Sequence, residues 1–185
     1  MTNFVSSGQN NRQTLIHKGR VFNVFQETVT LPNGASIKLD IIRHPGATAI
    51  VPLTRSHNVI MLEQYRHAVG GTIWEIPAGT LDDKEAPLTC AQRELTEETG
   101  YTAATWRKLG EITPVPGYSD ERIQIFLATD LSISVQNLDA DEALEVREVT
   151  FTEALNMISR GGIQDAKTIC GLFMAHACLK QHPAG

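Results

Sequence analysis

The first regular pattern along the chain is an alternation of apolar and polar residues between Thr14 and His44. Two runs, at residues 20–31 and 36–44, alternate in this way and are joined by a Pro-Asn-Gly turn. Period-two alternation predicts strands, and such a turn joins antiparallel neighbours. The predicted hairpin is apolar on both faces, and a two-stranded piece is only marginally stable alone. It therefore needs a partner surface, either as an extra edge of the main sheet or as an arm that forms a dimer.

A second pattern follows Pro45-Gly46, the predicted boundary between an arm of residues 1–45 and a main domain of residues 46–185. Apolar runs typical of buried strands alternate there with segments of helical periodicity. Thr152 and Asp165 are the predicted N-caps of two helices near the end of the chain. The pattern predicts an α/β fold, an α/β/α sandwich with mixed sheets, preceded by the antiparallel β-hairpin arm. The expected strands of the main domain are residues 47–54, 58–66, 72–79, 104–117, 121–129 and 144–151.

Three carboxylates, Glu94, Glu97 and Glu98, stand at i, i+3 and i+4 in a predicted helix that stops at Gly100. This spacing places all three on one helical face. Like charges one turn apart destabilise a helix by roughly 0.2–0.5 kcal/mol per pair unless a cation lies among them. Hard divalent ions such as Mg²⁺ take carboxylate oxygens together with substrate phosphates. The cluster is therefore either a solvated acidic face or a metal site, and its flanks favour the metal site.

The flanks carry a resemblance. The segment from Gly79 through Glu85, Arg93-Glu94-Leu95 and Glu97-Glu98 to Gly100-Tyr101 resembles the Nudix box of the Nudix hydrolases, although Tyr101 stands where that family more usually has an aliphatic residue. The resemblance implies hydrolysis of a phosphoanhydride with Mg²⁺, or Mn²⁺, as cofactor. It implies that Glu97 and Glu98 are catalytic and that the metal ligands are the Ala78 carbonyl, Glu94, Glu97 and Glu98.

Four further residues of the box are expected to shape it. Gly79 is needed where the backbone turns close to the ions, and Gly100 is the predicted C-terminal stop of the helix. Arg93 is either the counter-charge of the acidic cluster or the partner of Glu85 in a structural ion pair. Similarity to the family favours the structural pair.

A string outside the box points to a subgroup. The sequence from Pro116 to Glu121, Pro-Gly-Tyr-Ser-Asp-Glu, resembles that of the ADP-ribose pyrophosphatase and nucleoside-diphosphate-sugar hydrolase subgroup. The alternative is an ordinary Pro-Gly turn. The resemblance makes Pro116 and Glu121 candidate substrate contacts. It also makes Arg66, which ends the run Glu-Gln-Tyr-Arg, the candidate ligand of the diphosphate, the alternative being a surface arginine at a strand end.

An acidic segment, residues 139–145, precedes the last strand. By similarity, Glu142 is the carboxylate that takes a proton from the attacking water. A solvated loop charge is the alternative for Glu142. Glu145 is the competing candidate, although it is expected to lie in the strand.

The arm has an implied role as well. In the relatives this hairpin crosses to a partner subunit, so the resemblance implies a homodimer with swapped arms. Phe22 or Phe25 would stack on the nucleobase and Arg43 would make a polar contact, although aromatic residues in strands more often belong to a core.

Composition limits the classes of molecule that the protein is expected to bind. The net charge is -5 and no basic stripe offsets it, which argues against a nucleic-acid groove. The cysteines, Cys90, Cys170 and Cys178, have no metal-ligand spacing and read as buried small side chains in a reducing compartment. No apolar run is long enough to cross a membrane and no signal-peptide core is present, so a cytoplasmic enzyme is expected.

The sequence thus predicts a metal-dependent Nudix pyrophosphatase that cleaves ADP-ribose to AMP and ribose 5-phosphate. Two alternatives stay open. One is a broader nucleoside-diphosphate-sugar hydrolase, acting for example on GDP-mannose, or a nucleoside triphosphate pyrophosphatase. The other is a nucleotide-binding or regulatory module without turnover, which the complete set of box carboxylates disfavours.

Overall fold

The computed structural model describes residues 12–138 and 143–181. Its contacts divide the chain into two compact units. The first contains the described residues up to Pro45 together with Val115–Glu121, and the second contains the remainder. The sequence order places Val115–Glu121 inside residues 46–185, whereas its contacts place it with the first unit.

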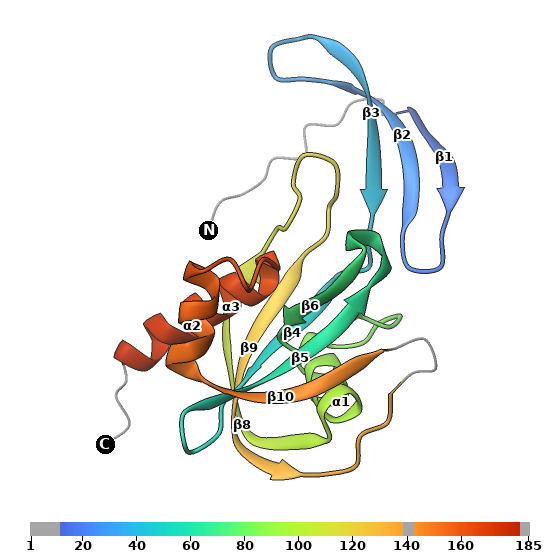
Figure 1. The fold of residues 1–185 in the computed structure, drawn as a ribbon. Helices are drawn as coiled ribbons and strands as arrows, with labels where there is room; N and C mark the ends of the chain where they lie inside the picture. Colours follow the sequence, from blue (N-terminus) through green and yellow to red (C-terminus); the bar gives the residue numbers. More distant parts are fainter. Residues whose placement is uncertain (1–11, 139–142, 182–185) are drawn as a thin grey trace. The chain divides into compact units, whose positions relative to one another are not determined.

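The first unit is a three-stranded antiparallel sheet of β1 (Arg12–Lys18), β2 (Asn23–Thr30) and β3 (Ser36–Arg43), with β2 in the centre (Figure 1). The predicted hairpin is β2–β3, and its turn closes through the Gly34 N–H, which donates to the Leu31 carbonyl at 2.8 Å. β1 is a further strand, and every one of its residues is exposed.

Val115–Glu121 binds along β3. The Ile42 N–H donates to the Tyr118 carbonyl at 2.7 Å, and the Asp120 N–H donates to the Ile42 carbonyl at 3.2 Å. The Asp120 carboxylate also accepts from the His44 N–H at 2.9 Å. This string therefore satisfies backbone groups along β3, as a short extra strand would.

The second unit contains two sheets. A mixed sheet has the order β7 (Ala78–Thr80), β4 (Ala47–Pro52), β9 (Ile123–Ile133) and β8 (Tyr101–Ile112), with β4 and β9 parallel. An antiparallel sheet has the order β10 (Leu144–Thr150), β5 (Asn58–Arg66) and β6 (Gly71–Glu75), and η1 (His67–Val69) joins β5 to β6. Antiparallel neighbours can be joined by a short turn. The parallel strands β4 and β9 need a long crossover connection between them.

Helices cover the mixed sheet on both faces. Alternate residues of β4 and β9 point to opposite sides. Ala49 and Ile125 belong to one core with α2 (Phe151–Ser159) and α3 (Ala166–Gln181). Ile50 and Phe126 belong to another with α1 (Pro87–Thr99). The ribbon shows α2 and α3 together and α1 apart from them (Figure 1). This confirms the predicted α/β fold with mixed sheets.

Two of the three predicted helix ends are correct. Gly100 ends α1 with φ 70° in the left-handed region, and Asp165 caps α3 by accepting from the Thr168 N–H at 2.9 Å. The prediction for α2 was wrong by two residues, because Thr150 and not Thr152 accepts from the Glu153 N–H. Thr150 precedes the helix in extended conformation, as an N-cap must, whereas Thr152 is already helical. Within residues 12–138 and 143–181, no helix combines the length and the apolar character needed to span a bilayer.

Candidate active site in the box helix

Two of the three clustered glutamates lie on the buried face of α1. Cys90, Glu94 and Glu98 follow at intervals of four residues and form one row along the helix. Glu94 is 9% exposed and Glu98 is 2% exposed, whereas Glu97 is half-buried beside them. A carboxylate is rarely buried unless its charge is compensated. The cluster is therefore not a solvated acidic face.

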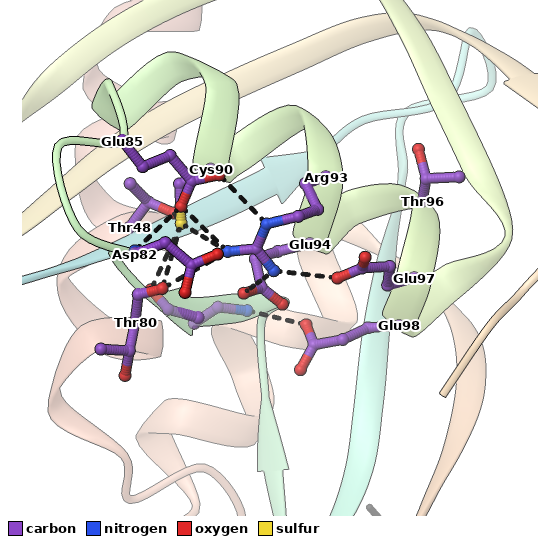
Figure 2. Close-up of polar contacts among 12 residues, drawn as sticks. Thr48, Thr80, Asp82, Glu85, Cys90, Arg93, Glu94, Thr96, Glu97 and Glu98 are labelled. Carbon is purple, nitrogen blue, oxygen red and sulfur yellow. Dashed lines mark hydrogen bonds and ion pairs between the residues drawn. The ribbon is translucent and has the colours of Figure 1, made fainter. Parts of the chain in front are cut away.

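Arg93 lies among the acidic side chains (Figure 2). Its Nε and Nη2 donate to the two carboxylate oxygens of Glu85, each at 3.1 Å. Its Nη1 donates to Glu94 at 2.6 Å and to Glu97 at 2.9 Å. Sequence reasoning offered two roles for Arg93, structural partner of Glu85 or counter-charge of the cluster. In this geometry one guanidinium does both.

The electrostatics follow from this arrangement. Hydrogen bonds from Arg93 hold the pKa of Glu85 below its ordinary value, against the opposing effect of burial. Hydrogen bonds to Glu85 raise the pKa of Arg93 against the opposing effect of burial, and the charge of Glu94 and the hydrogen bonds to Glu97 and Glu94 raise it further. The turn before the helix adds support, because the Asp82 N–H donates to Glu85 at 3.1 Å and the Glu85 N–H donates to the Asp82 carbonyl at 3.0 Å. Glu85 thus fixes the loop to Arg93.

Glu98 is held from the sheet side. One carboxylate oxygen accepts from the Ala78 N–H at 2.9 Å, in the strand just before Gly79. At the C-terminal end of the helix, the Glu98 carbonyl accepts from Gln136 Nε2 at 2.6 Å and the Glu97 carbonyl accepts from the Asn137 N–H at 3.0 Å. These bonds satisfy carbonyls that a helix end leaves without intrahelical partners.

Gly79 is required by close approach and not by a special backbone angle. A Cβ built on Gly79 would lie 1.9 Å from a carboxylate oxygen of Glu94 and 2.0 Å from its Cδ. The glutamate therefore packs directly against the glycine backbone. The sequence predicted that Gly79 is needed because the backbone turns there close to the ions. In the structure, Gly79 is needed because the Glu94 side chain packs against its backbone.

Cys90 is a polar member of the same row that sequence reasoning treated only as a small buried side chain. Its thiol accepts from the Thr48 hydroxyl at 3.4 Å and faces the Thr80 carbonyl at 3.5 Å. Burial raises the pKa of Cys90 to about 12. All three cysteines are free, and Cys170 and Cys178 are only partly buried.

The residues present fit a divalent cation by the chemistry of their donors. Glu94, Glu97 and Glu98 offer carboxylate oxygens on one helical turn beside the Ala78 backbone, the donor type that Mg²⁺ and Mn²⁺ take. Arg93 compensates the charges of Glu94 and Glu97 here. In the described part of the chain, no group of three or more His, Cys, Asp or Glu side chains converges as ready metal ligands.

The other candidate residues lie on different elements. Arg66 ends β5 and pairs with the buried Glu75 through Nη2 at 2.7 Å. Glu145 lies in β10, as expected, and forms an ion pair with Arg147. Glu142 lies outside the described residues.

In the first unit, Arg43 joins two acidic side chains. Its Nη2 donates to the buried Glu27 at 2.5 Å and its Nη1 to Asp120 at 3.0 Å. These hydrogen bonds raise the pKa of Arg43 although burial opposes them. Phe22 is 41% exposed, and Glu121 lies 3.8 Å from the imidazole of His44. Arg43 therefore ties the string of Pro116 to Glu121 to its sheet, a function that the sequence did not indicate.

An open hollow of about 620 Å³ lies over β5, β6 and β10. Glu63 and Arg147 line it and form an ion pair at 2.7 Å. Its lining includes neither the box glutamates nor Arg66, so we assign no substrate to it.

Comparison with known proteins identifies the family. Residues 43–171 match the NUDIX domain. The match spans most of the chain and includes the whole of α1 with its loop. The chain belongs to the Nudix family, whose hydrolases generally depend on divalent metal ions.

Three relatives show the range of activities among similar chains. The ADP-ribose pyrophosphatase of Bacillus subtilis (strain 168) is 43% identical over 83% of this chain and 84% of its own. The methanol dehydrogenase activator of Bacillus methanolicus is 41% identical over the same shares. The GDP-mannose pyrophosphatase of Escherichia coli (strain K12) is 35% identical over 70% of this chain and 76% of its own.

A solved structure supports the fold. The crystal structure of an ADP compounds hydrolase superposes with a TM-score of 0.81, covering 95% of this chain and 97% of that one, at 21% identity. This likeness confirms the predicted fold. The NUDIX match confirms the predicted membership of the Nudix hydrolases.

Proposed function

We propose that this Nudix enzyme hydrolyses the diphosphate of ADP-ribose to AMP and ribose 5-phosphate. The buried row of Glu94 and Glu98 against β7 carries the proposal, because so costly an arrangement is explained by a cation and an anionic substrate. The similarity to an ADP-ribose pyrophosphatase at 43% identity supports this substrate over others.

The residues proposed to hold the metal are Glu94, Glu97, Glu98 and the Ala78 carbonyl. Mg²⁺ is our first choice and Mn²⁺ the second, since both prefer oxygen donors. When bound, the ion would neutralise phosphate charge and lower the pKa of a bound water.

The protein's own groups would do the rest. Glu98 is fixed by the Ala78 N–H, and Glu94 by Arg93 and the Gly79 surface, so both carboxylates are held before substrate arrives. A water oxygen attacks phosphorus, the anhydride P–O bond breaks, and the proton of the water passes to a carboxylate that we assign to Glu142. Arg66 would hold the diphosphate, as its exposed end permits.

The domain roles are also proposed. Residues 46–185 would form the hydrolase domain and residues 1–45 an arm exchanged in a cytoplasmic homodimer, with Phe22, Arg43, Pro116 and Glu121 near the nucleobase. Exposed apolar side chains in the first unit support an arm that needs a partner, among them Leu15 at 49% and Ile16 at 58% exposed.

The experiment is AMP release from ADP-ribose with Mg²⁺, with Mn²⁺ and with chelator, alongside GDP-mannose and a nucleoside triphosphate. Strongest turnover of ADP-ribose supports the proposal. Equal rates on the two sugar nucleotides would favour the broader hydrolase, consistent with the GDP-mannose pyrophosphatase relative. No metal-dependent turnover at all would favour a regulatory module, consistent with the activator relative.

A further inference from the structure

Glu75, the last residue of β6, is a buried carboxylate shared by two cations. It is 3% exposed. One oxygen accepts from Nε and Nη2 of Arg66 at 2.8 and 2.7 Å, and the other accepts from Lys167 Nζ at 2.7 Å. The box contacts described above do not include Glu75, Arg66 or Lys167.

The rest of the cluster explains why the buried charge is tolerated. Lys167, in the first turn of α3, also donates to Asp165 at 3.1 Å. Asp165 accepts from the N–H and hydroxyl of the fully buried Thr168, whose oxygen accepts from the Ile76 N–H at 2.9 Å. Two cations balance two carboxylates, and Thr168 links Asp165 to the backbone of Ile76, so the buried charges are both paired and hydrogen-bonded.

Glu75 binds the Nε and Nη2 side of the Arg66 guanidinium and leaves the Nη1 side without a contact from Glu75. Both contacts reach a single oxygen through Nε and Nη2, so the two Nη1 hydrogens and one on Nη2 engage no other residue within the described ranges. The side chain is 41% exposed. Its partner across the strands is Gly71, beside which an added Cβ would meet nothing. The outward fork is therefore uncrowded.

We propose that Glu75 is a positioning residue that holds Arg66 with this fork directed at an anionic diphosphate. A planar guanidinium recognises phosphate oxygens in pairs, so its orientation determines affinity. Because Glu75 divides its charge between Arg66 and Lys167, Arg66 keeps its attraction for an anion. The inference rests on the proposed function, since it assumes a nucleoside diphosphate ligand.

The test is a double-mutant cycle on ADP-ribose hydrolysis with wild type, Arg66→Ala, Glu75→Gln and the double variant. A hydrogen bond to a charged group contributes enough that losing the orientation should lower kcat/KM roughly ten- to a hundredfold, mostly through KM. In the Arg66→Ala background, Glu75→Gln should change kcat/KM by less than about threefold, because the residue it positions is gone. Arg66→Lys, which keeps the charge and loses the fork, should show a KM close to that of Glu75→Gln.

Equal effects of Glu75→Gln with and without Arg66 would overturn the proposal, because Glu75 would then act on the fold or through Lys167. Glu153→Gln is the matched control, since Glu153 also pairs with an arginine but lies on the exposed side of α2, and it should leave KM unchanged. If urea unfolding shows that Glu75→Gln does not fold, Glu75→Asp replaces it in the cycle, with the same expected loss of additivity. Absence of turnover in wild type would refute the proposed function separately. The cycle would then be measured as the calorimetric Kd for ADP-ribose, where additivity overturns the proposal and non-additivity supports it.

Discussion

Gly79→Ala tests whether the position of the Glu94 carboxylate determines activity. The added Cβ would lie 1.9 Å from a Glu94 oxygen, whereas ordinary contact begins at about 3.4 Å. The carboxylate must therefore retreat by about 1.5 Å or rotate away, which also disturbs its bond to Arg93. Misplacing a catalytic group by about 1 Å can cost about 10²-fold in rate. We expect kcat/KM to fall by about 10²-fold and the metal requirement to shift to higher concentration.

The fold should survive this change. The far end of a flexible side chain can move, and alanine costs less backbone entropy than glycine by roughly 0.5–1 kcal/mol. We expect the free energy of unfolding in urea to change by less than about 1 kcal/mol. The assay is AMP release across a Mg²⁺ titration, paired with urea unfolding of the same sample.

Gly162→Ala is the matched control, because a Cβ there meets nothing closer than 3.4 Å and the residue is remote in sequence from the box. It should leave kcat/KM unchanged. Wild-type turnover and Mg²⁺ dependence in Gly79→Ala would refute the reasoning. Activity would then not depend on the position that the Glu94 carboxylate occupies against Gly79.

The remaining predictions concern four other features. Glu98→Gln should nearly abolish AMP release while leaving thermal unfolding unchanged, because the amide oxygen can still accept from the Ala78 N–H but cannot neutralise a cation; normal activity would remove Glu98 from the site. Glu142→Gln should lower kcat by roughly 10²–10⁴ if it is the general base, and an effect on KM alone would place the base elsewhere. Deleting residues 1–45 should give a monomer by light scattering that binds nucleotide poorly, and an active monomer would exclude the exchanged arm. The pKa of Glu85 is lowered in the folded protein, so its ion pair stabilises the fold above the unfolded pKa of about 4.5, and this stabilisation is lost as pH falls through the folded pKa. The free energy of unfolding of Glu85→Gln, measured against pH, should lack this loss at acid pH. Curves for wild type and variant that run parallel would refute the pairing.

Features that depend on neighbouring residues were predictable from the sequence. The spacing of Glu94 and Glu98 fixes them on one face of any helix, and Gly100 stops that helix because it can adopt a left-handed conformation. The hairpin of β2 and β3 follows from alternation and its turn. Such local rules hold wherever the segment lies in the molecule.

Contacts between distant segments were not predictable in this way. Arg66, Glu75 and Lys167 come from two strands and a helix, and no pattern in the sequence indicates that they pair. Val115–Glu121 reads as a turn in the main domain, yet its backbone bonds to β3. No local pattern encodes which distant surface satisfies a charge or a backbone group.

The sequence by itself therefore indicated the acidic helix through the spacing of its glutamates, and the family and its metal chemistry through the resemblance of residues 79–101 to the Nudix box. Only the tertiary structure decided that Glu94 and Glu98 face inward, that Gly79 lies under Glu94, and that Arg93 serves Glu85 and the cluster at once. The physical reason is burial. A helix has two sides whatever its sequence, but packing on β4 and β9, beside β7, selects the side on which a carboxylate loses water and must be compensated.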